Sequence, residues 1–211
     1  MKILLVDDHA LVHRGVTQVL REDFPDLTIV EKDTAQDAIE ATQTTPWDLV
    51  MLDINLPDKS GLDALKDIKR ITPNLPVLML SLHPEAQYAK RAFKAGASGY
   101  LTKDQAPEEV TIAVKRILQG GRCVSAALAE QLAADLGAAS GETPALHRLL
   151  SDRELEVLRL IGSGKAPTDI AEQLALSIKT VSTYRARVLE KLNLRTTADL
   201  IRFTVDHQLT M

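Results

Sequence analysis

Acidic, hydroxyl and amine side chains follow separate apolar stretches in the first half of this 211-residue sequence. They are Asp7 and Asp8 after KILLV (2–6), Asp53 at the end of DLVMLD (48–53), Ser81 after PVLML (76–80) and Lys103 after SGYLT (98–102). A carboxylate beside a buried strand is unfavourable unless a cation or hydrogen bonds compensate its charge. The spacing therefore suggests that folding brings these side chains together.

Strand-like runs alternate with helical patterns as far as about residue 121. A further strand is expected at LTIVEK (27–32), and amphipathic helices are expected at 9–22, 35–43, 60–71, 85–96 and 108–121. In the first helix, Leu11, Val12, Val16 and Leu20 are expected to share one buried face. This alternation predicts an α/β fold with a doubly wound, five-stranded parallel sheet and helices on both faces.

In such a sheet, ligands bind outside the carboxyl ends of the strands. With the strand order 2-1-3-4-5, the five polar groups converge on one pocket. Three carboxylates repel one another, and a single lysine does not balance them, whereas Mg²⁺ prefers an all-oxygen ligand set. Asp53 can then attack a phosphoryl group, while Lys103 and the Ser81 hydroxyl stabilise the phosphoryl oxygens.

Each of these residues alone has an ordinary explanation. Asp7 or Asp8 can cap the first helix, Asp53 can open the turn before Pro57, and Lys103 can be a solvated side chain. Their joint occurrence at the strand ends favours a functional site.

The motifs LLVDDH, VMLDINLPDKSG, LMLS and GYLTK resemble, in this order, the receiver domain of two-component response regulators over residues 2 to about 121. The resemblance implies that Asp53 is the phosphoacceptor. It implies that Asp8 and Asp53 bind Mg²⁺ directly, that Asp7 acts largely through water, and that Asn55 contributes its backbone carbonyl.

The same resemblance implies that Ser81, Lys103 and Tyr100 form the switch that responds to phosphorylation. The sequence departs from many receivers at Asp104, where they have proline. Phosphatases similar to haloacid dehalogenases also use a strand-terminal aspartate, but they place a second aspartate two residues later. Asn55 stands at that position here, which argues against a phosphatase.

The C-terminal part has a different pattern and a different charge. Residues 1–146 carry six more acidic than basic residues, whereas 147–211 carry two more basic than acidic ones. We expect a receiver domain at 1–121, a linker at 122–146 that includes a helix at about 126–136, and a small all-α domain at 147–211. Four helical patterns indicate that last domain, at 151–164, 167–175, 177–192 and 197–207.

The third of these patterns has one apolar and one polar face. Val181, Tyr184, Val188 and Leu192 should face the core, and Lys179, Ser182, Thr183, Ala186 and Arg187 should lie away from it. Small hydroxyl side chains and cations suit the DNA major groove. By pattern alone, a solvated face of an ordinary bundle helix is an equally good interpretation.

Residues 150–201 resemble the LuxR-type helix-turn-helix from end to end, which together with a receiver is typical of NarL/FixJ-class response regulators. By this resemblance, the residues expected to contact DNA are Lys179, Thr180, Ser182, Thr183 and Arg187. At KAPTDIA, Ala166 and Pro167 lack the polar side chains common in the family, so phosphate anchoring there is expected to be weaker. The resemblance also implies a sensor histidine kinase, double-stranded DNA, and a homodimer formed through Leu200, Ile201 or Val205.

Composition agrees with a soluble cytoplasmic protein. The hydrophobic fraction is 45%, there is one cysteine, and no apolar run approaches the length of a membrane span, so no membrane partner is expected. We expect no enzymatic activity beyond the receiver's own phosphorylation and dephosphorylation. An adaptor that acts without phosphorylation is a further alternative, which the intact acidic site disfavours.

Overall fold

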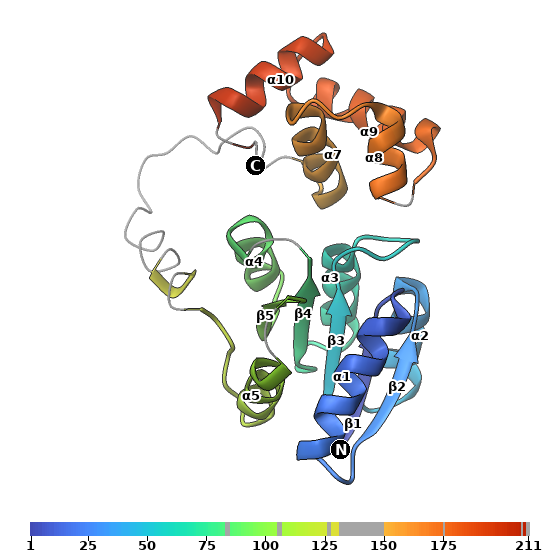
Figure 1. Cartoon of the computed structure of the whole chain (residues 1–211), viewed down its shortest axis with the longest axis vertical. Coiled ribbons are helices and arrows are strands. Elements are labelled where there is room, and N and C mark those ends of the chain that lie inside the picture. Colours follow the sequence, from blue (N-terminus) through green and yellow to red (C-terminus); the bar gives the residue numbers. More distant parts are fainter. Residues whose placement is uncertain are drawn as a thin grey trace. The chain divides into compact units, whose positions relative to one another are not determined.

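The computed structural model describes residues 1–82, 85–104, 107–125, 128–130, 150–174, 176–207 and 209 (Figure 1). The contacts divide the chain into two compact units, one with the sheet and one with the last four helices. The linker at 122–146 lies largely outside the described residues. So does the helix at about 126–136, apart from the helical residues 128–130.

The first unit contains a parallel sheet with the order β2-β1-β3-β4-β5 (Figure 1). Its strands are β1 (Lys2–Val6), β2 (Thr28–Lys32), β3 (Leu49–Asp53), β4 (Val77–Ser81) and β5 (Gly99–Thr102). Every residue of β3 and β4 is buried, as continuous apolar runs covered on both faces require. The expected fold class and strand order are confirmed.

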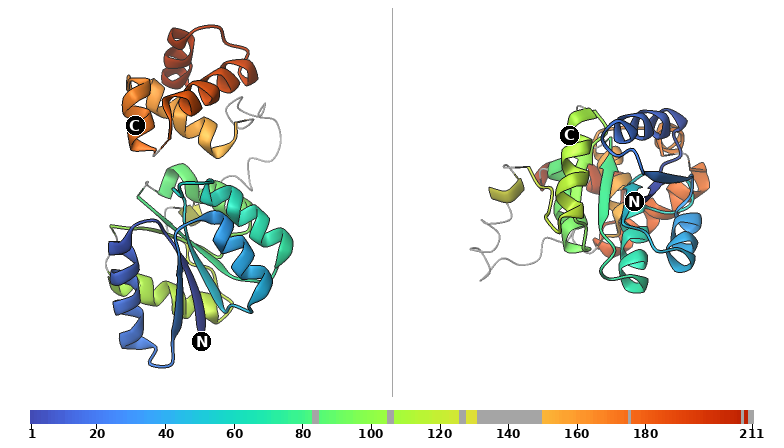
Figure 2. Two further views of the ribbon diagram at one scale, coloured as in Figure 1. Left: turned by 90° about the vertical axis from the view of Figure 1, so that its right-hand side faces the viewer. Right: turned by 90° about the horizontal axis from the view of Figure 1, so that it is seen from below.

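Helices cover both faces of this sheet (Figures 1 and 2). They are α1 (Ala10–Asp23), α2 (Ala35–Thr44), α3 (Gly61–Ile71), α4 (Glu85–Lys94) and α5 (Pro107–Leu118). Alternate strand residues divide the core: Leu4 and Val50 pack in the layer of α2, α3 and α4, whereas Leu5 and Met51 pack in the layer of α1 and α5. The pleat of the strands thus fixes which residues reach each layer.

The expected burial of Leu11 is wrong. Leu20 is fully buried, and Val12 and Val16 are partly buried, but Leu11 is 81% exposed. Successive helical residues are rotated by about 100°, so Leu11, nine positions before Leu20, lies on the opposite side of α1. The apolar stripe therefore begins at Val12.

The second unit consists of α7 (Asp152–Gly162), α8 (Pro167–Gln173), α9 (Ile178–Lys191) and α10 (Thr197–Asp206). Ser151 and Glu154 form the expected capping box of α7, and Pro167 opens α8. Leu158, Ile170 and Val188 bring three helices into one apolar core. None of the described helices has both the length and the apolar character of a membrane span.

Candidate functional site

The five polar residues singled out in the sequence lie at the carboxyl ends of β1, β3, β4 and β5, at one edge of the sheet. Asp53 ends β3 next to Leu80 of β4, and the backbone N–H of Lys103 donates to the carbonyl of Ser81 at 2.7 Å. Asp7 follows β1, which pairs with β3. Parallel pairing in this register therefore places residues from four distant stretches of sequence side by side.

The Lys103 ammonium lies between two carboxylates. Its Nζ is 2.7 Å from Asp7 Oδ2 and 2.8 Å from Asp53 Oδ2, and all three side chains are buried. Buried charges are tolerated when they are paired, but one ammonium neutralises only one of these two carboxylates. The pocket therefore holds an excess of negative charge that a divalent cation would balance.

Burial raises the pKa of Asp53 to about 6, because the charged carboxylate has left water. The Lys103 ammonium lowers this pKa and the Asp7 carboxylate raises it, so the two charges oppose each other. The folded chain thus binds the Asp53 proton more tightly than the unfolded chain does.

This raised pKa predicts a pH-dependent stability in the absence of metal. Below about pH 4, Asp53 is protonated in both the folded and the unfolded chain. As the pH rises to about 6, only the unfolded chain releases this proton. Folding therefore becomes less favourable over this range. Compared with that of Asp53→Asn, the free energy of unfolding of the wild type should fall by up to about 3 kcal/mol between about pH 4 and pH 7. Urea unfolding of both proteins in chelator at the two pH values measures this, and a constant difference between them would contradict it.

His9 lies beside the carboxylates, a contact that was not predicted from the sequence. Its Nδ1 is 2.7 Å from Asp8 Oδ1 and 3.0 Å from Asp7 Oδ1. Ligand atoms of Asp7, Asp8, His9 and Asp53 all lie within 4.8 Å of one another. This donor set, rich in carboxylate oxygens and negative charge, fits a hard divalent cation such as Mg²⁺.

The loop between β3 and α3 shapes the other side of the pocket. Ile54 and Leu56 are buried in the core and flank Asn55, which forms a β-bridge with Ser60. A Cβ at Gly61 would lie 1.8 Å from the carbonyl oxygen of Asp53, so only glycine lets α3 begin this close to the strand. The loop is thereby held against the residue that it follows.

Ser81 and Tyr100, two of the three residues expected to form the switch, are both in the interior. Ser81 is fully buried at the end of β4. Tyr100 of β5 is 3% exposed and belongs to the core beneath α2, α3 and α4. In this structure the aromatic side chain is therefore already turned inward.

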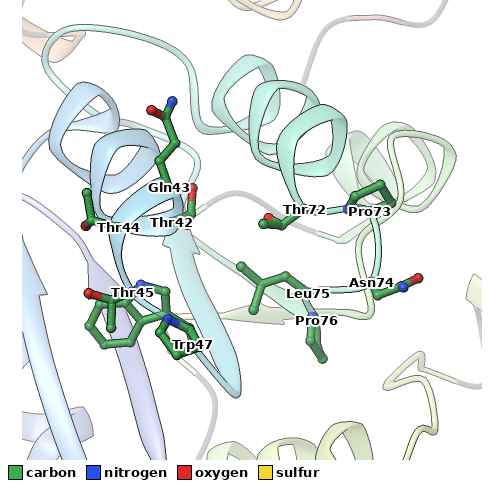
Figure 3. A pocket seen from close by; sticks show the side chains of 11 residues that line it. Thr42, Gln43, Thr44, Thr45, Trp47, Thr72, Pro73, Asn74, Leu75 and Pro76 are labelled. Atoms are coloured by element: carbon green, nitrogen blue, oxygen red, sulfur yellow. The ribbon is translucent and has the colours of Figure 1, made fainter.

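A surface hollow at the opposite edge of the sheet is lined by residues 42–47 and 72–76 (Figure 3). These segments precede β3 and β4, so they lie at the amino ends of the strands. Trp47, Leu75 and Pro76 give the hollow an apolar surface, and none of its lining residues carries a charge. Its named lining residues include neither a carboxylate nor a cation, so the acidic pocket is the better candidate for phosphoryl chemistry.

In the second unit, α9 has the two faces that its sequence predicts. Val181, Val188 and Leu192 are buried, and Tyr184 packs partly buried against them. Lys179, Ser182, Thr183, Ala186 and Arg187 are exposed, and Thr180 is half-buried. The polar face is thus free for a ligand of this unit.

Side-chain hydrogen bonds organise that polar face. The Ser177 hydroxyl accepts from the backbone N–H of Thr180 at 3.0 Å and caps the first turn of α9. The hydroxyls of Ser182 and Thr183 donate to carbonyls one turn earlier, at 2.9 and 3.0 Å. Because their protons are used within the helix, these hydroxyls present acceptor lone pairs outward.

Helix α10 carries the three alternatives for a contact between subunits. Leu200 is fully buried in the unit's own core, which leaves it no surface for such a contact. Ile201 and Val205, one turn apart, are 38% and 59% exposed. Ile201 and Val205 are therefore the large apolar side chains that α10 exposes for such a contact.

Comparison with known proteins gives matches over both units. A family model described as response regulator receiver domain matches residues 3–115, and one described as bacterial regulatory proteins, luxR family, matches residues 148–204. The response regulator UvrY of Escherichia coli strain K12 is 36% identical over 211 residues, which cover 99% of this chain and 95% of UvrY.

Solved structures similar to this chain also include response regulators. A two-component response regulator of the LuxR family from Aurantimonas sp. SI85-9A1 is 35% identical, with a TM-score of 0.57 over 64% of this chain and 96% of that one. RcsB of Salmonella enterica serovar Typhimurium, bound to promoter P1flhDC in the presence of the phosphomimetic BeF3⁻, is 24% identical. Its TM-score is 0.58 over 96% of this chain and 97% of that one, a likeness of fold alone.

Proposed function

Because this chain belongs to the two-component response regulators that join a receiver domain to a LuxR-type helix-turn-helix domain, we propose that phosphorylation of Asp53 controls its binding to DNA. The observation that carries the proposal is the ion-paired arrangement of Asp7, Asp53 and Lys103 at the sheet edge. It combines a nucleophilic carboxylate with a fixed positive charge, as phosphoryl transfer requires.

In the proposed reaction, an Asp53 carboxylate oxygen attacks the phosphorus of a donor, and the bond from phosphorus to the donor's leaving group breaks. Lys103 and the Ser81 hydroxyl stabilise the charge on the phosphoryl oxygens. Asp8, Asp53 and the Asn55 carbonyl would hold Mg²⁺, with Asp7 acting largely through water. When bound, Mg²⁺ supplies positive charge that offsets the repulsion between the carboxylates and the incoming phosphoryl group.

The proposed switch uses Ser81 and Tyr100. After phosphorylation, the Ser81 hydroxyl donates to a phosphoryl oxygen, and Tyr100 is held in its inward position behind it. The phosphorylated site then stabilises one of two arrangements of β4, β5 and α4. The added charge at Asp53 thereby changes the surface formed by these elements, to which partners bind.

The proposed domain boundaries are 1–121 for the receiver, 122–146 for the linker and 147–211 for the DNA-binding domain. The partners are a sensor histidine kinase, double-stranded DNA and, after phosphorylation, a second copy of the chain. Lys179, Thr180, Ser182, Thr183 and Arg187 are the proposed DNA contacts. With such partners, the chain acts in the cytoplasm as a regulator and transforms no substrate other than its own phosphoryl group.

DNA binding before and after phosphorylation tests this function. The full chain, incubated with Mg²⁺ and a small phosphodonor, should bind sites selected from a random duplex pool more tightly than untreated chain, and sedimentation should show more dimer. A fragment of residues 147–211 should retain binding to the same sites, since it carries the contacts. Equal affinity and equal dimer fraction before and after complete phosphorylation would refute control by phosphorylation.

A further inference from the structure

Asp58 joins the loop after β3 to a helix that precedes it in the chain. Its Oδ1 accepts from the backbone N–H of Ala35, and its Oδ2 accepts from that of Gln36, both at 2.9 Å. These are the first two N–H groups of α2, which have no partner within the helix. A carboxylate there also interacts favourably with the positive end of the helix dipole.

The rest of the loop is tied to β3 and α3 instead. Gly61 donates its N–H to the Ile54 carbonyl at 2.8 Å, and Lys59 forms an ion pair with Asp67 of α3. The two hydrogen bonds that Asp58 accepts are a separate link, from this loop to α2. Both sets of contacts hold the segment that contains Asn55.

Thr34 supplies a local cap at the N-terminal end of α2, and the two hydrogen bonds to Asp58 are additional to it. Thr34 occupies the N-cap position, and its hydroxyl accepts from the N–H of Asp37 at 3.1 Å. This local cap is made within one turn of sequence, whereas Asp58 lies 23 residues after Ala35. Ala35 is fully buried with Asp58 in place, so removal of Asp58 takes a charged acceptor away from this N–H group.

We propose that Asp58 is a positioning residue, which holds the loop so that the Asn55 carbonyl faces the metal site. The negative charge of Asp58 itself is bound at the N-terminus of α2. The inference rests on the proposed function, since it concerns Mg²⁺ binding at that site. Loss of a group that orients a metal ligand typically lowers metal affinity by tenfold or more. Asp58→Ala is therefore expected to weaken Mg²⁺ binding by about tenfold.

Thr34→Ala is the matched control, because it removes a hydrogen bond from the same turn of α2 and leaves the loop untouched. Calorimetric titration of the full-length wild type and both variants with Mg²⁺ gives the affinities, and thermal unfolding shows whether they are folded. Thr34→Ala should bind Mg²⁺ within about twofold of the wild type. Asp58→Asn, which keeps one acceptor oxygen, should lie between the wild type and Asp58→Ala.

Amide hydrogen exchange supplies a readout that does not depend on metal. Asp58→Ala should exchange faster than the wild type at 35–36 and across 54–60, whereas Thr34→Ala should change only the start of α2. If Asp58→Ala and Asp58→Asn bind Mg²⁺ as tightly as Thr34→Ala does, the positioning role is wrong. If the wild type itself binds no Mg²⁺, the proposed function fails at its metal site, and the positioning role fails with it.

Discussion

Asp53→Asn is expected to abolish phosphorylation of the chain. A carboxamide is a poor nucleophile toward phosphorus, whereas the Asp53 carboxylate is buried at the strand end with Lys103 at 2.8 Å. The substitution keeps the shape of the side chain, so the sheet and the core beneath it should be unaffected. Incubation with Mg²⁺ and a small phosphodonor, followed by intact mass measurement, should show one acid-labile phosphoryl group on the wild type and none on the variant.

Asp104→Asn is the control for this experiment. Asp104 is exposed and adjacent to Lys103, so its substitution removes a nearby negative charge without touching the pocket. It should be phosphorylated as the wild type is. Equal labelling of Asp53→Asn and the wild type would move the phosphoacceptor to another residue, and peptide mapping would identify it.

Asp8→Ala separates the metal from the nucleophile. The variant retains Asp53 and Lys103 but loses an exposed carboxylate of the acidic cluster. Its phosphorylation should be much slower and should no longer respond to added Mg²⁺, because a proposed direct ligand is gone. An unchanged response to Mg²⁺ would remove Asp8 from the ligand set.

The sheet was predictable because its strands are nearly continuous apolar runs. Each expected strand agrees with the observed one to within one residue at either end. The convergence of Asp7, Asp53, Ser81 and Lys103 followed from the strand order alone, since parallel strands end at a common edge. Local pattern and topology therefore sufficed for the position of the pocket.

Contacts between elements were less accessible to sequence reasoning. Nothing local to Asp58 indicates that its partners are the N–H groups of Ala35 and Gln36, because the contact depends on how α2 and the loop pack. The burial of Leu200 was missed because apolar side chains on a short helix can face either its own core or a partner. For Leu11, counting the helical rotation back from Leu20 would have corrected the error.

The expected effects on DNA binding distinguish two kinds of contact on α9. Lys179 and Arg187 are exposed cations, and a cation that contacts phosphate contributes to affinity for any sequence. Lys179→Ala or Arg187→Ala should weaken binding to all duplexes and reduce the slope of log affinity against log salt by about one unit. Arg202→Ala, which removes an exposed cation from α10, should leave the slope unchanged and serves as the control.

Ser182 and Thr183 are expected to change sequence preference instead. Their hydroxyl protons are donated to the carbonyls of Ile178 and Lys179, so they face the groove as acceptors. In the major groove the complementary donors are the amino groups of adenine and cytosine. Ser182→Ala and Thr183→Val should therefore relax a preference for adenine or cytosine at one position in each half-site, with half-sites about 10 base pairs apart for a symmetric dimer. Selection from a random duplex pool with the wild type and each variant measures this. If all four variants on α9 keep the wild-type preference and salt slope, another element of the second unit must read the DNA.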